Sequence, residues 1–181
     1  MSPVHFVAKK DGKRRMVQDY HHINQWTIKN RYPLPLIVDI LDGVGKRKVF
    51  TKLDLRWGYN NVKIKEGDKW KAAFTTHIGA YKPTVMYFGL TNFSATFQTM
   101  MNNLFQDLIN QGDTVTFIND ILVAIDTKEG HDELVEKVLK RLEENDLFVK
   151  PKKCKQNVRE PNSVPELSQL LFVQRLTKRT Q

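Results

Sequence analysis

Apolar and polar positions alternate in several short stretches of the N-terminal half, which is the period of a half-buried strand. Residues 4–20 hold two such stretches around a polar segment that contains Asp11-Gly12, a dipeptide typical of hairpin turns. The pattern therefore predicts an N-terminal β-hairpin. Four further strands are expected at about 49–55, 59–65, 71–76 and 81–87.

Three segments instead repeat apolar residues every three or four positions, which is the period of a helix with one buried face. They cover Leu36 to Val44, about Ser94 to Ile109, and about Gly130 to Asn145. Strands and helices mixed in this order, with hairpins between neighbouring strands, indicate the α+β class. We expect a mainly antiparallel sheet with helices packed on one face.

The most distinctive pattern is an apolar hairpin near residue 120. Two strand-like runs, at 115–118 and 121–125, flank the polar pair Asn119-Asp120, which reads as a two-residue turn. Another apolar strand carries Asp54, 66 positions earlier. Carboxylates that converge from separate strands suit a Mg²⁺-dependent phosphoryl-transfer site, because Mg²⁺ prefers oxygen ligands. The structural alternative is a plain turn, since Asn and Asp favour turns on their own account.

Length and charge narrow the class of protein. With 181 residues and 40% hydrophobic content, the chain is expected to form one domain, or one domain with a small appendage. The net charge is +9, and residues 1–56 carry 12 Lys and Arg against 5 Asp and Glu. A basic first third suits a polyanionic partner such as nucleic acid, although a solvated basic face is the alternative.

Cysteine and histidine usage excludes other classes. The single cysteine, Cys154, cannot form an internal disulfide and fits a reducing compartment. The histidines, including His21-His22, show no zinc-ligand spacing. No apolar run approaches the roughly 18 residues of a membrane span. We therefore expect no membrane partner and an intracellular location, cytoplasmic or nuclear.

A series of short motifs runs through the chain in a fixed order. They are Ser2-Pro3-Val4, Lys9-Lys10-Asp11-Gly12, Asp19-Tyr20, Arg31-Tyr32-Pro33-Leu34-Pro35, Phe50-Thr51-Lys52-Leu53-Asp54-Leu55, Lys71-Ala72-Ala73-Phe74, Phe88-Gly89-Leu90-Thr91-Asn92, the hairpin at 117–123 and Lys152-Lys153-Cys154. In order and spacing, over about residues 2–160, they resemble the reverse transcriptase domain of gypsy-type LTR retrotransposons.

The resemblance implies a right-hand polymerase fold of which this chain holds the palm and part of the fingers. It implies that Asp54, Asn119 and Asp120 form the catalytic tip of the palm, with Asp54 and Asp120 as metal ligands. Two Mg²⁺ ions are expected in an active complex, with Mn²⁺ as a substitute. The implied partners are an RNA or DNA template-primer and a deoxynucleoside triphosphate.

The resemblance also implies a set of nucleotide-binding residues. Tyr59 stands where the family places an aromatic ring that excludes a ribose 2′-hydroxyl, and the alternative is a core aromatic. Basic side chains from the fingers would contact the triphosphate, and backbone from the palm would approach it. The full set is Lys9, Arg15, Leu55, Arg56, Tyr59, Phe88 and Gly89.

Some positions depart from the family pattern. Asn119 stands where the family has aspartate, so one ligand charge is lost and polymerisation is expected to be severely weakened. Tyr87 and Phe93-Ser94 replace the family's Pro and Ala-Pro.

The ends of the chain depart as well. Residues 1–160 are expected to form a truncated fingers and palm domain that begins midway through the fingers. Residues 161–181 are expected to form a divergent, loosely ordered basic tail without a thumb, which would weaken synthesis further.

Three functions follow from these observations. The first is an RNA-directed DNA polymerase core, and the second is a module that binds nucleic acid without chemistry. The third is a retrotransposon remnant whose exposed apolar surfaces favour a homo-oligomer. Mg²⁺-dependent primer extension would support the first, and salt-sensitive binding without extension would support the second.

Overall fold

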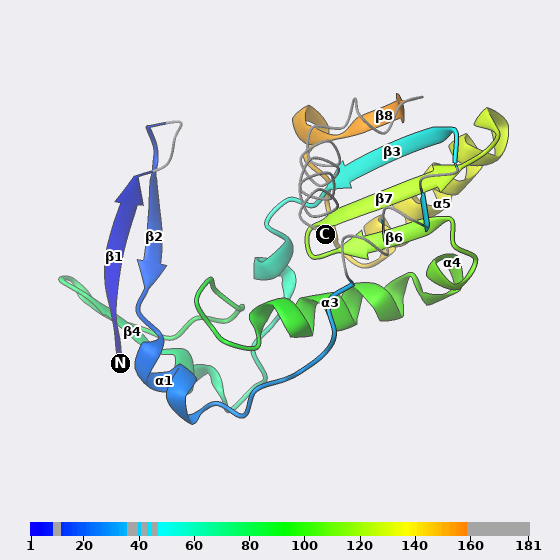
Figure 1. Ribbon diagram of the computed structural model, residues 1–181. Coiled ribbons are helices and arrows are strands. Elements are labelled where there is room, and N and C mark those ends of the chain that lie inside the picture. The colour runs from blue at the N-terminus through cyan, green and yellow to red at the C-terminus, as the bar shows by residue number, and fades with distance from the viewer. Residues whose placement is uncertain (9–11, 36–39, 41–42, 45–46, 159–181) are drawn as a thin grey trace, which may run out of the picture. The chain divides into compact units, whose positions relative to one another are not determined.

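The computed structural model describes residues 1–8, 12–35, 40, 43–44 and 47–158. The chain divides into two compact units. The first unit comprises Met1–Tyr32 and Trp57–Phe97, and the second comprises Pro33–Arg56 and Gln98–Gln181. Each unit has its own four-stranded sheet (Figure 1). The α+β class expected from the sequence is confirmed. No described helix combines the length and apolarity needed to cross a membrane.

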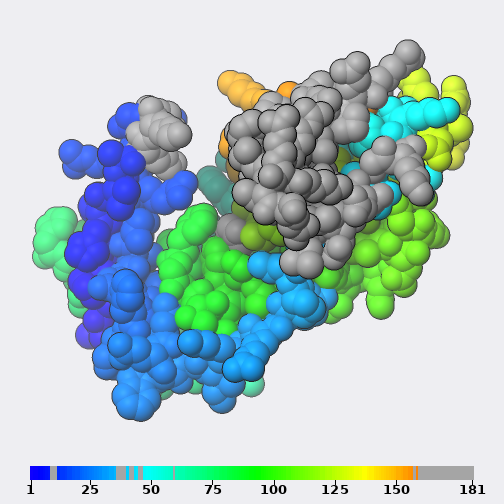
Figure 2. All heavy atoms as spheres, viewed as in Figure 1, coloured from blue at the N-terminus to red at the C-terminus, as the bar shows by residue number. Residues whose placement is uncertain are grey.

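The first unit is built on the predicted N-terminal hairpin. Strand β1 (Ser2–Ala8) pairs antiparallel with β2 (Arg14–Gln18), in a register that sets Val4 opposite Gln18. The sheet order is β2-β1-β4-β5, with β4 (Phe74–Thr76) parallel to β1 and β5 (Gly79–Tyr81) antiparallel to β4. Most of β1 is exposed, and it lies in dark blue at the surface of the space-filling view (Figure 2).

A buried tyrosine links the hairpin to the rest of the first unit. Tyr20 follows β2 and precedes the short helix α1 (His21–Trp26). Its ring is 2% exposed, and its hydroxyl donates a hydrogen bond to the carbonyl of Ala72 at 3.1 Å. Burial raises the pKa of Tyr20 to about 12, so the phenol stays a neutral donor at physiological pH. Ala72 ends η2 (Lys69–Ala72), and Ala73 alone separates it from β4.

Two strands predicted in the first unit are wrong or shortened. The predicted strand at 59–65 contains the 3₁₀ turn η1 (Gly58–Asn61), which begins after Trp57 adopts a positive φ of 52°. Only Lys63 forms a bridge, to Val85. The predicted strand at 81–87 is replaced by β5, which ends at Tyr81. The alternation of apolar and polar residues was read as a half-buried strand here. Few of these residues, however, form backbone hydrogen bonds with a neighbouring strand.

The second unit contains the central sheet of the palm-like fold. Its order is β6-β7-β3-β8, and all its ladders are antiparallel. The strands are β3 (Val49–Asp54), β6 (Thr114–Phe117), β7 (Asp120–Ile125) and β8 (Lys155–Val158). The helices are α3 (Phe93–Leu104, of which the part from Gln98 belongs to this unit), α4 (Gln106–Asn110), α5 (Lys128–Glu144) and the 3₁₀ turn η3 (Pro151–Lys153).

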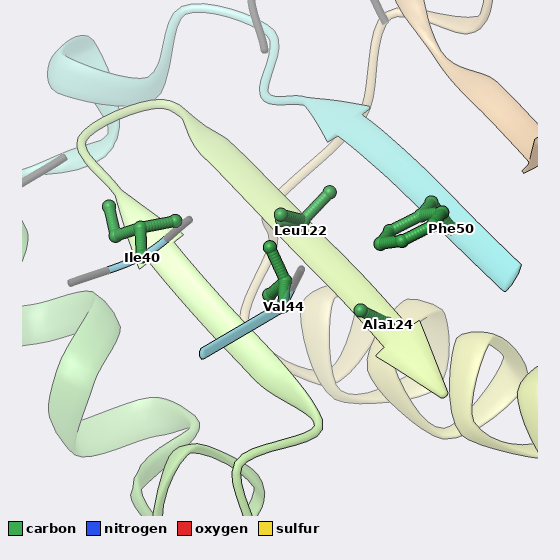
Figure 3. Close-up of a cluster of buried hydrophobic side chains, with 5 residues drawn as sticks. All are labelled: Ile40, Val44, Phe50, Leu122 and Ala124. Carbon is green, nitrogen blue, oxygen red and sulfur yellow. The ribbon is translucent and has the colours of Figure 1, made fainter. Parts of the chain in front are cut away.

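Strand β3 is buried along five consecutive residues, so both of its faces are covered. On one face Phe50 packs with Ile40, Val44, Leu122 and Ala124 in a hydrophobic cluster (Figure 3). On the other face the side chain of Thr51 lies against α5, since it shares a cavity of about 220 Å³ with Val135 and Leu139. A rigid, fully buried strand therefore supports Asp54 at its end.

The predicted helices differ in how far they are tested. The one at 130–145 is confirmed as α5. The one at 94–109 is broken at Phe105, whose φ of −115° separates α3 from α4. Of the helix predicted at 36–44, Ile40, Gly43 and Val44 are helical, and the other positions lie outside the described residues. The basic tail predicted at 161–181 also lies outside them.

Candidate active site

The two predicted metal ligands meet at one end of the two central strands of the second sheet. Asp54 ends β3 and Asp120 begins β7, and the antiparallel register places the two residues directly opposite each other. Directly opposed residues have Cβ atoms about 4.5–5.5 Å apart. Like charges in this position repel, so the pair requires a cation near both carboxylates.

The turn beside them is shifted by one residue from the sequence prediction. Strand β6 pairs Phe117 with Asp120, so the turn consists of Ile118 and Asn119 rather than Asn119 and Asp120. Ile118 has a positive φ of 53°, a conformation that is rare for a β-branched residue and costs about 1–3 kcal/mol. The strain persists because surrounding groups hold the turn in place.

Gln98 of α3 is the group that holds the turn. Its side chain is fully buried, and its Oε1 accepts a hydrogen bond from the Ile118 N–H at 2.7 Å. Its Nε2 donates to the Thr116 carbonyl and to Asn102 Oδ1, both at 2.8 Å. A buried glutamine thus fixes the hairpin tip to a helix, which the sequence analysis missed. The available signal was a polar residue one position after Phe97 in the apolar pattern of a predicted helix.

Asn119 sits at the tip with a side-chain oxygen that no described residue contacts as a donor. Its Oδ1 is buried and lacks a hydrogen-bond partner among the described residues. Leaving a buried acceptor unpaired costs about 1–3 kcal/mol. On the main chain, the Asn119 carbonyl accepts from the Leu55 N–H at 2.9 Å, which ties the tip to the end of β3. The side-chain oxygen is therefore an unpaired acceptor at the tip.

Three lysines surround the two carboxylates. Lys150 Nζ donates to Asp54 Oδ1 at 2.7 Å, and Lys153 Nζ lies 3.7 Å from Asp54 Oδ2. Lys52 Nζ lies 3.4 Å from Asp120 Oδ1. Lys52 is 6% exposed within β3, and a buried ammonium requires such a partner. None of the three was predicted as a site residue, although a lysine inside a buried strand pattern was a readable signal.

The donor set fits a divalent cation held by oxygen atoms. Asp54 and Asp120 supply two carboxylates, and Asn119 supplies an unpaired amide oxygen. Such oxygen ligands suit Mg²⁺ and Mn²⁺. Among the described residues no group of three His, Cys, Asp or Glu side chains comes together. The residues present therefore provide two charged ligands and one neutral ligand, and the lysine ammonium groups must give way to an ion.

The backbone of Leu55 and Arg56 was expected to approach the triphosphate, but both backbone N–H groups donate to other parts of the protein. The Leu55 N–H donates to Asn119, and the Arg56 N–H donates to the Phe148 carbonyl at 2.6 Å. Both amides are thus engaged within the protein instead of being open to a phosphate. Leu55 is fully buried, whereas the Arg56 side chain is exposed. Contact between the Arg56 guanidinium group and a nucleotide stays a prediction.

In the first unit the structure brings together Arg15 and Phe88. The Arg15 guanidinium carbon lies 5.1 Å from the centroid of the Phe88 ring, within cation–π range. Phe88 also packs against Phe93 at 5.3 Å between centroids. Lys9 lies outside the described residues. Tyr59 lies in η1, and the role of its ring as a steric gate stays a prediction.

Gly89 follows Phe88 and has a backbone conformation that suits glycine. Its φ is +102°, and a Cβ atom there would meet the Gln18 carbonyl oxygen at 3.4 Å and the Tyr20 ring at 3.5 Å. The Gly89 carbonyl accepts from Asn24 Nδ2 at 2.6 Å, and Asn24 Oδ1 accepts from the Thr91 N–H at 2.9 Å. The loop that carries Gly89 is therefore fixed against β2 and α1.

Comparisons with known proteins agree with this geometry. The family described as "Reverse transcriptase (RNA-dependent DNA polymerase)" matches residues 7–169. The Tf2-3 and Tf2-7 transposon polyproteins of Schizosaccharomyces pombe are 35% and 34% identical over 152 residues, which is 84% of this chain and 11% of each polyprotein.

Solved structures are similar over nearly the same length. The foamy viral protease-reverse transcriptase in complex with double-stranded DNA matches with a TM-score of 0.81 and 27% identity, over 88% of this chain and 28% of that one. The same viral protein in complex with an RNA/DNA hybrid matches with a TM-score of 0.78 and 26% identity, over 86% of this chain and 20% of that one.

Proposed function

Because this chain belongs to the reverse transcriptase family, we propose that it is the catalytic core of an RNA-directed DNA polymerase from a retroelement. The resemblance to gypsy-type LTR elements drawn from the motifs is confirmed by the transposon relatives. The observation that carries the proposal is the register that sets Asp54 opposite Asp120 at the end of a buried strand. The chain spans about a tenth of the length of those relatives, so the activity of the whole protein is part of the proposal.

The proposed reaction transfers the nucleoside monophosphate part of a deoxynucleoside triphosphate to a primer 3′-hydroxyl, forming a phosphodiester bond and releasing pyrophosphate. Asp54 and Asp120 would hold Mg²⁺, with Asn119 as a neutral third ligand. When bound, the divalent ions would lower the pKa of the primer hydroxyl and stabilise charge on the phosphoryl group. Arg15, whose guanidinium group contacts the Phe88 ring, is the described fingers cation that the family resemblance implies for the triphosphate.

Nucleic acid is the proposed partner of the whole chain. The solved relatives named above were bound to double-stranded DNA and to an RNA/DNA hybrid. This chain carries a net charge of +9, with the excess of Lys and Arg concentrated in residues 1–56. Binding that depends on such charges weakens steeply with salt, because counterions are released from the phosphates.

Asn119 sets the expected rate. An amide oxygen can bind Mg²⁺ but brings no charge. The positive charge of the bound ions must then be offset by two carboxylates alone. Loss of one ligand charge is expected to cost about 3–5 kcal/mol in the transition state, which corresponds to a factor of about 10²–10⁴ in rate. The chain is therefore proposed to be a slow polymerase whose metal site is short of one charge.

Primer extension by the full chain tests the proposal. The wild-type chain and Asn119→Asp are compared on a primed RNA template with Mg²⁺, and Asp54→Asn serves as a blank. We expect Asn119→Asp to extend the primer about 10²–10⁴ times faster than the wild type. Equal rates in the two proteins would show that the missing charge does not limit catalysis. Binding of the template-primer without extension by Asn119→Asp would refute the polymerase and favour a binding module.

A further inference from the structure

Lys150 is held beside Asp54 by the main chain as well as by its side chain. The Lys150 N–H donates to the Asp54 carbonyl at 2.8 Å, and Lys150 Nζ donates to Asp54 Oδ1 at 2.7 Å. Next to it, Leu55 and Val149 form an antiparallel bridge. The segment at 148–150 therefore runs alongside the end of β3, and the backbone directs the ammonium group to the carboxylate.

The other side of Lys150 is also fixed. Its carbonyl accepts from the Lys153 N–H at 2.9 Å and from the Cys154 Sγ at 3.2 Å. These contacts close the η3 turn, and the chain then enters β8, which pairs with β3. Lys150 is thus anchored between two segments that are each bonded to the strand bearing Asp54. The backbone of Lys150 is therefore placed by the fold, and this places its side chain beside Asp54.

The ammonium group stands where a divalent ion needs to bind. The proposed ion must reach Asp54, whose side chain is 15% exposed, and Lys150 already occupies Oδ1 of that carboxylate. Two positive charges on one carboxylate repel each other strongly when the carboxylate is shielded from water. With Asn119 neutral, three described lysines (+3) face two carboxylates (−2), so the cluster carries a net charge of +1 before any ion binds.

We propose that Lys150 is a built-in counter-ion that competes with the divalent cation for Asp54. It neutralises the carboxylate and limits the repulsion from Asp120 when no ion is bound, and it swings away when an ion binds. The inference rests on the proposed function, because that function places the ion at these residues. It adds a residue that sets the affinity for the ion and that no carboxylate motif reveals.

A purely structural ion pair makes a different prediction. In that case, removal of the Lys150 charge lowers the stability of the fold and leaves the affinity for the ion unchanged or lower. Under competition, removal of the same charge increases the affinity, because the ion no longer displaces an ammonium group. The sign of the change in affinity therefore separates the two roles.

The first test measures Mn²⁺ binding to the full chain without nucleic acid, by the electron paramagnetic resonance signal of free Mn²⁺. We expect Lys150→Gln to bind Mn²⁺ about five- to tenfold more tightly than the wild type, as for loss of a partly buried ion pair. Lys150→Arg, which keeps the charge, is expected to stay within about twofold. Lys152→Gln is the matched control, because it removes an exposed lysine two positions away and screening makes its effect small.

The Mn²⁺ binding results test the competition between Lys150 and the ion independently of the primer-extension assay. Affinity of Lys150→Gln equal to or below that of Lys152→Gln would overturn the competition, even if primer extension succeeds. Absence of Mn²⁺ binding in every variant would overturn it as well. Tighter binding by Lys150→Gln without primer extension would support the competition and leave only the polymerase refuted.

The second test needs no variant. The full chain is treated briefly with an amine-reactive ester, and the labelling of individual lysines is measured by mass spectrometry. Without metal, Lys150 is expected to react several-fold more slowly than Lys152, because its ammonium group is paired with a carboxylate. Addition of Mn²⁺ is expected to increase the rate at Lys150 and leave Lys152 unchanged. A constant rate at Lys150 while Mn²⁺ binds would refute its displacement.

Discussion

Replacement of Gln98 by leucine is expected to loosen the tip that carries Asn119. Gln98→Leu keeps the buried volume close to its present value but removes the acceptor for the Ile118 N–H and the donor to the Thr116 carbonyl. A buried polar group left without a partner costs about 1–3 kcal/mol, and the Ile118 amide is only partly buried. We therefore expect the free energy of unfolding to fall by about 2–4 kcal/mol.

The same change releases the strain at Ile118. The positive φ of 53° is held by the hydrogen bond to Gln98, so the turn can relax when that bond is lost. We expect this relaxation to change the position of the Asn119 side chain, which lies between Ile118 and Asp120 in the chain. We expect Mn²⁺ affinity to fall in Gln98→Leu, whereas a mutation that only destabilises the core would leave the affinity of the folded protein unchanged.

Urea denaturation followed by circular dichroism measures the first effect, and Mn²⁺ titration measures the second. Gln106→Leu is the matched control, because Gln106 is exposed at the start of α4 and makes the same chemical change. The control is expected to stay within about 0.5 kcal/mol of the wild type. A loss below about 1 kcal/mol in Gln98→Leu, with unchanged Mn²⁺ affinity, would refute the view that Gln98 fixes the tip.

Two further predictions concern the first unit and the pH dependence. Gly89→Ala is expected to lower the free energy of unfolding by about 1–3 kcal/mol in urea titrations, because its φ of +102° is a conformation that residues with a Cβ rarely adopt; a neutral effect would contradict that conformation. A hydrogen bond from Arg141 holds the pKa of Asp107 well below its usual value, so this carboxylate stabilises the fold at neutral pH and loses that contribution as the pH falls below about 4. Asp107→Asn should flatten the acid limb of the stability profile, and an unchanged profile would exclude this ion pair as a contributor.

The sequence predicted correctly those strands and helices whose apolar residues repeat with a clear period. The N-terminal hairpin, β3, the hairpin of β6 and β7, and α5 all follow from the periods of their apolar positions. The convergence of Asp54 and Asp120 was expected because each acid stands at one end of an apolar strand. The predicted strand at 59–65 failed because alternation reports burial and does not supply a ladder partner.

The sequence by itself determined the family, the α+β class and the identity of the two carboxylates, because these depend on residue types in a fixed order. Only the tertiary structure decided the position of the turn, since the pairing of Phe117 with Asp120 is set by the sheet. It also decided that Lys150, 96 positions from Asp54, pairs with that carboxylate. Hydrogen bonds between distant segments leave no period in the sequence. The ion pairs that lysines form with Asp54 and Asp120 therefore become visible only in the folded chain.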